Sequence, residues 1–179
     1  MKILAFAASN SKNSINKQIV THATNVYKSE FDQNADIEIL NLNDYEMPIY
    51  SIDREIEGGI PAKAQEFYDK IGESDAIIIS FAEYNYSFTS AYKNVFDWAS
   101  RIKMKVYQSK PVLHISGSIG PGGAAGVLKS ANDSAPYFAA DLKASFSVSS
   151  FGEKFDTDKG EFKDADLAAK LREGLKAIA

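Results

Sequence analysis

The sequence predicts an α/β protein in which a parallel sheet is covered by helices on both faces. Two observations support this prediction. Continuously apolar runs of strand length, such as residues 3–8 and 76–81, are typical of strands buried on both faces. Each run is followed by a polar loop and then by apolar residues at helical spacing, which gives a repeating strand–loop–helix unit. The 179 residues suit one core, so we expect residues 1–179 to form a single domain.

The first unit consists of a strand over residues 3–8, a polar loop over 9–14 and a helix. Ser14 stands where the N-cap of that helix belongs. Apolar residues then recur at helical spacing from Ile15 to Tyr27. This unit therefore begins the parallel arrangement.

The second and third units repeat the pattern. Residues 37–42 predict a strand, and the helix after it is opened by Pro61 and ended by Gly72. Residues 76–81 predict the most deeply buried strand, followed by a polar, aromatic loop over 82–87. The next helix carries its apolar residues at helical spacing: Ala91, Val95, Trp98 and Ile102. We expect this third unit to lie centrally.

The last two units are less regular. Residues 112–116 predict the fourth strand, and the glycine-rich stretch 117–123 predicts a flexible loop before an indistinct helix. The fifth strand is expected over 143–149, and residues 151–163 are expected to form a charged surface excursion. Asp164 begins the final helix, whose apolar face is Leu167, Leu171, Leu175 and Ile178.

Five such units match the flavodoxin-like fold, a three-layer sandwich whose five-stranded parallel sheet has the order 2-1-3-4-5. Right-handed crossovers place helices on both faces of this sheet. Ligands of such folds bind beyond the carboxyl ends of the strands, where the winding direction reverses between strands one and three. The loops after strands one, three and four are therefore the candidate site.

Composition excludes several classes of function. The chain has no cysteine and only two histidines, His22 and His114, which excludes disulfides and thiol nucleophiles and makes a metal site improbable. His114 lies in an apolar strand and is expected to be a hydrogen-bonded core residue. A net charge of −4 disfavours binding to nucleic acid or to a membrane surface. The apolar start lacks the features of a signal peptide, so we expect a cytoplasmic protein. With no cysteine, any redox chemistry must come from a bound cofactor, and we expect no catalytic side chain.

The first candidate loop suits phosphate. Its polar side chains are Ser9, Ser11, Ser14 and Asn16. Lys12 and Lys17 lie where a helix N-terminus normally favours acidic residues, and no acid occurs in residues 1–29. A bound anion would resolve that conflict. Because the loop has neither glycine nor a Walker motif, it fits a terminal monophosphate better than a pyrophosphate. Alternatively, Ser14 caps the helix and the lysines are merely solvated.

The second and third loops suit a flat heteroaromatic ring. Residues 82–88 combine an amide, hydroxyls and three aromatic side chains, which can cover a ring face while backbone groups meet its polar edge. In residues 116–123, glycines let the backbone approach a ligand closely. The alternative is that the aromatic residues pack against helices or a second subunit.

At these residues the chain resembles the NAD(P)H-dependent FMN reductase family. The resemblance is carried by Ser9 through Asn16, by Glu83-Tyr84-Asn85-Tyr86-Ser87, and by Lys93-Asn94 and Asp97-Trp98. It implies a phosphate site formed by Ser9, Ser11, Ser14, Ile15 and Asn16. It implies a ring site bordered by Ala82, Glu83, Tyr84 and Asn85 and completed by Ser116, Gly117, Ser118 and Gly120. The chain departs from the family pattern at Ser11, where arginine is frequent, and at Ala82, which replaces proline.

The resemblance implies an FMN-dependent enzyme that takes electrons from NAD(P)H and passes them by a ping-pong mechanism to quinones, azo compounds, metal oxyanions or flavins. It also implies a homodimer or homotetramer. An alternative is a flavodoxin-type electron carrier without its own NAD(P)H oxidase activity. A phosphorylated receiver domain is excluded, because it needs clustered acids after the first strand and an aspartate after the third.

Overall fold

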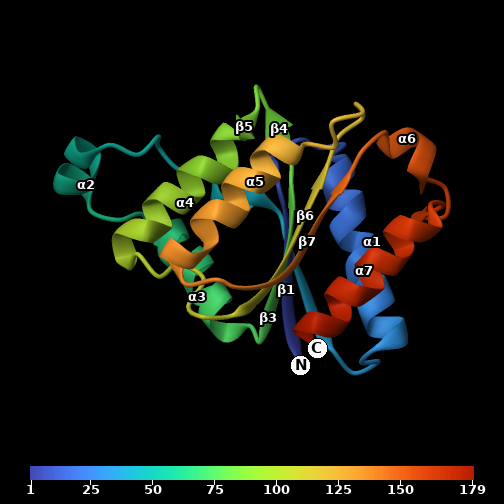
Figure 1. The fold of residues 1–179 in the computed structure, drawn as a ribbon. Coiled ribbons are helices and arrows are strands. Elements are labelled where there is room, and N and C mark those ends of the chain that lie inside the picture. Colours follow the sequence, from blue (N-terminus) through green and yellow to red (C-terminus); the bar gives the residue numbers. More distant parts are fainter.

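A computed structural model describes residues 1–179 and shows a three-layer α/β sandwich (Figure 1). The central sheet is parallel and has the order β2-β1-β3-β6-β7, which confirms the predicted order. Its strands are β1 (Lys2–Ala8), β2 (Asp36–Leu40), β3 (Ala76–Phe81), β6 (Pro111–Gly117) and β7 (Asp141–Val148). The predicted fold class is therefore correct.

Two layers of helices cover the sheet, and each encloses its own apolar core (Figure 1). One face is covered by α1 (Ile15–Glu30) and α7 (Ala165–Ile178). The other is covered by α3 (Ala62–Glu73), α4 (Ser90–Ile102) and α5 (Ala125–Ser134), which leads into the short 3-10 helix η2 (Ala135–Phe138). None of these helices combines the length and apolar character that a membrane crossing requires.

Burial explains why the central strands form where they do. Every residue of β3 and all but the first of β1 are buried, because both strands have helices on each face. Edge strand β2 is only partly buried and ends at Leu40. Leu42, expected at the end of this strand, instead begins the 3-10 helix η1 (Leu42–Tyr45). Its buried side chain belongs to the core under α3 and α4.

The predicted end of α3 at Gly72 is wrong by one residue. The helix continues to Glu73, and Ser74 adopts an extended conformation there. Gly72 has another role, because a Cβ at this position would lie 2.8 Å from Oε1 of Gln108. The glycine makes room for that side chain, whose Nε2 donates a hydrogen bond to the carbonyl of Tyr68.

Residues 151–163 are more than a surface excursion. They form the one-turn helix α6 (Phe151–Lys154) and an antiparallel pair, β8 (Phe155–Asp156) and β9 (Glu161–Phe162). Phe151, Phe155 and Phe162 are buried in the core beside α1 and α7. The acidic and basic residues between them obscured this apolar contribution in the sequence.

Two further elements were not predicted. Residues 83–88 form a hairpin, β4 (Glu83–Tyr84) and β5 (Ser87–Phe88), at the upper edge of the molecule in Figure 1. The helix α2 (Ile52–Gly58) projects from the side of the molecule and has no buried residue. The hairpin strands have two residues each and α2 has seven, so both segments are shorter than the periodic runs by which the other elements were recognised.

Candidate functional site

The candidate site lies at the carboxyl edge of the sheet, where the loop after β1 leads into α1. Ser14 is the N-cap of α1, and its hydroxyl oxygen accepts a hydrogen bond from the Lys17 backbone N–H at 3.2 Å. At the same edge, the Thr89 hydroxyl donates to the carbonyl of Ala8 at 3.0 Å. The N-cap of α4 is thereby tied to the end of β1, so the loops after β1 and β3 are held together.

The loop after β1 leaves donors free for an anion. The backbone N–H groups of Ile15 and Asn16 have no acceptor within the protein. Lys12 and Lys17 take part in no ion pair, and α1 has no acidic residue in its first turn. Ser9 accepts the Ser11 N–H at 3.2 Å, which shapes the loop and leaves its own hydroxyl proton available. The arrangement favours a bound negative charge.

The serines and lysines of this segment line a hollow of about 180 Å³. Its lining includes Ser9, Ser11, Lys12 and Ser14 of the loop and Lys17 of α1, and a second wall is formed by residues 40–43, at the end of β2 and just after it. Sequence reasoning missed this second wall. The predicted strand order could have indicated this wall. Because β2 lies beside β1 and parallel to it, the carboxyl end of β2 must reach the same edge of the sheet.

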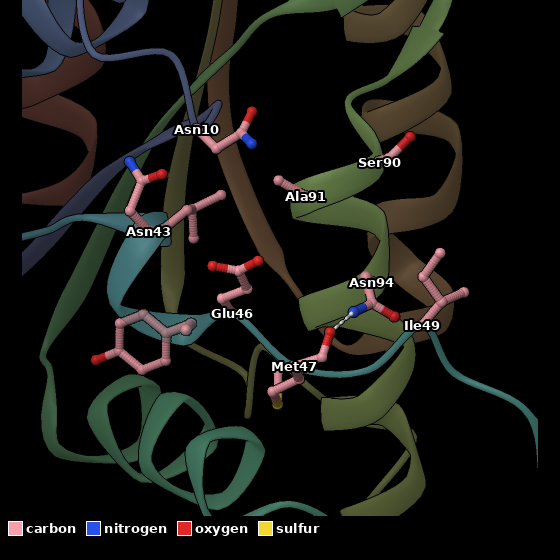
Figure 2. A pocket seen from close by; sticks show the side chains of 10 residues that line it. Asn10, Asn43, Glu46, Met47, Ile49, Ser90, Ala91 and Asn94 are labelled. Atoms are coloured by element: carbon pink, nitrogen blue, oxygen red, sulfur yellow. Dashed lines mark hydrogen bonds between the residues drawn. The ribbon is translucent and has the colours of Figure 1, made fainter. Parts of the chain in front are cut away.

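A second hollow of about 220 Å³ adjoins the first and shares Leu42 and Asn43 with it. Figure 2 shows that η1 and the chain after it form one side, while α4 forms the other and Asn10 lies above. The Asn94 amide is occupied here, because it donates to the carbonyls of Met47 and Pro48. Sequence reasoning did not anticipate this hollow, since its residues come from three separate segments.

Asn16 has a different role from the one that the resemblance implies for its side chain. Its Oδ1 accepts a hydrogen bond from the Ser80 hydroxyl at 2.7 Å, and its Nδ2 donates to the carbonyl of Gly117 at 3.1 Å. The residue is 2% exposed. Its amide joins α1 to β3 and β6 beneath the loops, so only its backbone N–H remains available to a ligand.

The hairpin β4–β5 turns through Asn85 and Tyr86, which both have positive φ angles, 52° and 61°. Tyr84 and Tyr86 are 50% and 85% exposed. These two rings are therefore not core residues, whereas Phe88 packs against Phe81 and Tyr92, so the packing alternative within one subunit holds for Phe88 alone. Ala82, in contrast, is buried at the end of β3. The hairpin presents aromatic surface above the carboxyl edge of the sheet.

The glycine loop after β6 is anchored from below. The hydroxyls of Ser116 and Ser147 both donate to the carbonyl of Gly123, at 2.8 and 2.6 Å. Ser116 is fully buried and its hydroxyl is bonded within the protein, so its predicted contact with a ligand stays a prediction. Gly117 is buried as well, and a Cβ there would lie 2.5 Å from Cδ1 of Ile19.

The upper part of the glycine loop is more accessible. Ile119 is 83% exposed, and Ser118 and Gly120 are partly exposed beside it. The Ser118 hydroxyl donates to the carbonyl of Gly120 at 3.2 Å. These residues face solvent beyond the carboxyl end of β6, as the hairpin does beyond that of β3. We call the exposed surface between the two loops the open region.

Neither histidine belongs to this site. His114 is a hydrogen-bonded core residue, as predicted, with Nδ1 2.9 Å from Oδ1 of Asn132, and burial lowers its pKa to about 4. His22 packs edge-on against Phe155 and Phe162, and burial lowers its pKa too. The chain holds no cluster of potential metal ligands.

The fold places the chain among flavodoxin-like proteins. The flavoenzyme NAD(P)H:(acceptor) oxidoreductase FerB from Paracoccus denitrificans superposes with a TM-score of 0.77 at 23% identity, covering 99% of this chain and 94% of that protein. An azoreductase from Bacillus anthracis gives 0.68 at 17% identity, with coverages of 99% and 98%. At these identities the likeness shows the fold alone.

The sequence places the chain in a family. The sequence model of the family described as NADPH-dependent FMN reductase matches residues 1–153, so the chain belongs to that family. A quinone reductase from Escherichia coli is 29% identical over 120 residues, which is 67% of this chain. An NAD(P)H:quinone oxidoreductase from Solanum tuberosum is 32% identical over 123 residues, which is 69% of this chain. The matched regions span 61% of the length of each of these relatives.

Proposed function

We propose that the protein is an oxidoreductase that binds FMN and uses it to pass electrons from NAD(P)H to a small acceptor. The observation that supports this most directly is the anion cradle after β1. Serine hydroxyls and two unpaired lysines line one hollow of about 180 Å³, at the start of a helix whose Ile15 and Asn16 N–H groups have no acceptor within the protein. Family membership supports FMN as the ligand that carries the phosphate.

The donor set fits the terminal phosphate of FMN. The N–H groups of Ile15 and Asn16 and the hydroxyls of Ser9, Ser11 and Ser14 would hold the phosphate oxygens, which suits a dianion at a helix N-terminus. Lys12 and Lys17 would add positive charge where Ser11 replaces the arginine frequent in the family. A lysine contributes a point charge without the two-pronged geometry of arginine.

The open region between the hairpin and the glycine loop would hold the isoalloxazine ring. Tyr84 and Asn85 would border it on the hairpin, and Ser118 and Gly120 would border it on the glycine loop. Their exposure supports this placement, because the tyrosine rings offer an uncovered stacking surface. Ser116 and the Asn16 amide would support these loops from below without touching the ligand.

Bound FMN supplies a centre that can accept a hydride from a nicotinamide and release electrons to an acceptor. The chain's own contribution is to hold the phosphate, to orient the ring and to leave one of its faces open. Because one open face would serve both partners in turn, we propose that NAD(P)⁺ leaves before the acceptor binds. Quinones, azo compounds, metal oxyanions and flavins are the proposed acceptors, and the quinone reductase relatives favour the first of these.

We also propose that the chain forms a homodimer or homotetramer through α2 and the segment before it. Ile49, Ile52 and Ile56 are 74%, 52% and 77% exposed, and the helix buries none of its residues. A short helix with an exposed apolar stripe is a typical contact surface. Light scattering on an Ile52→Ser, Ile56→Ser double variant tests this, and an unchanged mass would contradict it.

The decisive experiment is a spectrophotometric titration of the purified protein with FMN, followed by anaerobic addition of NADH or NADPH and then of a benzoquinone. We expect stoichiometric binding, bleaching of the flavin band by a nicotinamide, and recovery of the band when quinone is added. Failure to bind FMN would refute the proposal. Binding without bleaching by either nicotinamide would favour an electron carrier instead.

A further inference from the structure

We propose that Glu83 is a positioning residue whose carboxylate clamps the β4–β5 hairpin to the first turn of α5. It thereby sets the separation of the two loops that border the proposed ring site. This inference rests on the proposed function. It differs in giving the Glu83 carboxylate a contact within the protein and not a contact with the ligand. The resemblance alone would place Glu83 beside the ring.

The clamp is a short hydrogen bond between distant parts of the chain. Oε2 of Glu83 accepts the backbone N–H of Val127 at 2.7 Å. Val127 is the third residue of α5, a position whose N–H is normally satisfied by the side chain of the N-cap residue. The residue at that N-cap is Ala124, which has no side-chain oxygen and a φ of 58°. Glu83 therefore supplies the cap that α5 lacks, and its charge suits the helix N-terminus.

Gly126 provides an independent observation. It lies in the first turn of α5, where glycine costs about 1 kcal/mol relative to alanine. A Cβ at this position would lie 2.8 Å from Oε2 of Glu83 and 3.6 Å from Cδ1 of Tyr86. The missing side chain thus makes room for the clamping carboxylate and for the tyrosine ring of the hairpin turn.

The hairpin needs such an attachment. It consists of only two residue pairs, Glu83 with Phe88 and Tyr84 with Ser87, and so short a hairpin is not stable by itself. Beyond α5, the glycine loop is fixed to β6 and β7 through the carbonyl of Gly123. A continuous set of contacts therefore runs from the sheet through the glycine loop and α5 to the hairpin.

The test compares Glu83→Ala with Glu83→Gln, because glutamine keeps an acceptor oxygen of similar reach. Binding of FMN, riboflavin and inorganic phosphate is measured by fluorescence and calorimetry. We expect Glu83→Ala to weaken FMN and riboflavin equally, by about tenfold, since one charge-assisted hydrogen bond is lost. We expect Glu83→Gln to remain within about threefold of the parent and phosphate binding to be unchanged throughout. Glu153→Ala, at an exposed carboxylate of α6, is the control.

Unchanged riboflavin affinity in Glu83→Ala would overturn the inference, and so would a loss in Glu83→Gln as large as in the alanine variant. A second variant, Gly126→Ala, should reproduce the loss of flavin affinity. Combining it with Glu83→Ala should lower the affinity little further. Additive losses would contradict a shared clamp.

Hydrogen exchange on the protein without flavin separates this inference from the proposed function. The Val127 amide should exchange faster in Glu83→Ala than in the parent, whether or not flavin binds. If the parent binds no flavin but the amide responds in this way, the clamp stands and the proposed function fails. An unchanged exchange rate would overturn the clamp itself.

Discussion

The two halves of the candidate site are built in different ways. The anion cradle, residues 9–17, consists of one loop and the first turn of one helix, and the N-cap of that helix, Ser14, lies within it. The ring-binding region comes from the hairpin at residues 83–88 and the glycine loop at 117–124, which are joined by contacts between distant residues. The donors for the anion are therefore local to one segment of the chain, whereas the geometry of the open region is a tertiary property.

Asn16 links the two halves, and its removal should have the largest effect. Asn16→Ala would leave the Ser80 hydroxyl and the Gly117 carbonyl buried without their partner. We expect a loss of about 3 kcal/mol in the free energy of unfolding, measured by urea titration. Asn25→Ala, at an exposed position of the same helix, is the control. A loss below about 1 kcal/mol would show that the halves are independent.

As the pH falls, the ring-binding half of the site should lose stability before the anion cradle does. His114 on β6 holds Asn132 of α5, and its pKa is lowered by burial to about 4, from 6.5 in the unfolded chain. Because the unfolded chain binds the proton first, the stabilising contribution is complete above pH 6.5 and is lost as pH falls towards 4. The loss amounts to about 3 kcal/mol.

Urea titrations at pH 7, 5.5 and 4 measure this dependence. His114→Gln should reduce the pH dependence of the free energy of unfolding, and His22→Gln should reduce it less. Hydrogen exchange at pH 5 should show faster opening of α5 than of the hydrogen-bonded turns of α1 that follow its first turn. Equal protection of both helices would remove the distinction between the two halves.

The lysines of the cradle should affect binding without supporting the fold. A Lys12→Gln, Lys17→Gln double variant should bind FMN about thirtyfold more weakly, because two charges near the phosphate are lost. Riboflavin, which lacks the phosphate, should bind as before. The variant should unfold at a slightly higher urea concentration, since positive charges at a helix N-terminus are unfavourable.

Lys28→Gln, in the last turn of α1, is the matched control for charge. Unchanged FMN affinity in the double variant would place the anion elsewhere. An equal loss of riboflavin affinity would mean that the cradle and the ring-binding region are not separable.

The smallest effect distinguishes two of the three serines of the cradle, Ser11 and Ser14. Ser14 caps α1, whereas the Ser11 side chain forms no hydrogen bond within the protein. Ser14→Ala should lower the free energy of unfolding by about 1 kcal/mol, while Ser11→Ala should leave it unchanged. Thermal unfolding measures the difference. Equal melting temperatures for the two variants would contradict the capping role.

The fold could be predicted because its signals are local. Buried strands such as β1 and β3 are continuous apolar runs, and Ser14 and Asp164 mark helix starts by their hydrogen-bonding side chains. The segments that were misjudged lack such signals. Residues 151–163 are mostly polar, yet three phenylalanines among them complete a core that only the packing of α1 and α7 creates.

The candidate site could be predicted only in part, for the same reason. A serine that caps a helix is evident from its place in the chain, but Ser116 was expected at the ligand and is instead buried beneath Gly123. The wall at residues 40–43 was missed because it comes from the end of the neighbouring strand β2 and the start of η1. Which side of a strand end faces the ligand depends on the elements packed around it.

By itself, the sequence determined the succession of strands and helices and the positive, serine-rich start of α1. These follow from apolar periodicity and from capping between residues only a few positions apart. The tertiary structure alone decided that Glu83 reaches Val127 and that the Asn16 amide is directed inward. Such contacts join residues 44 to 101 positions apart, and they exist only once the sheet has brought the strand ends together.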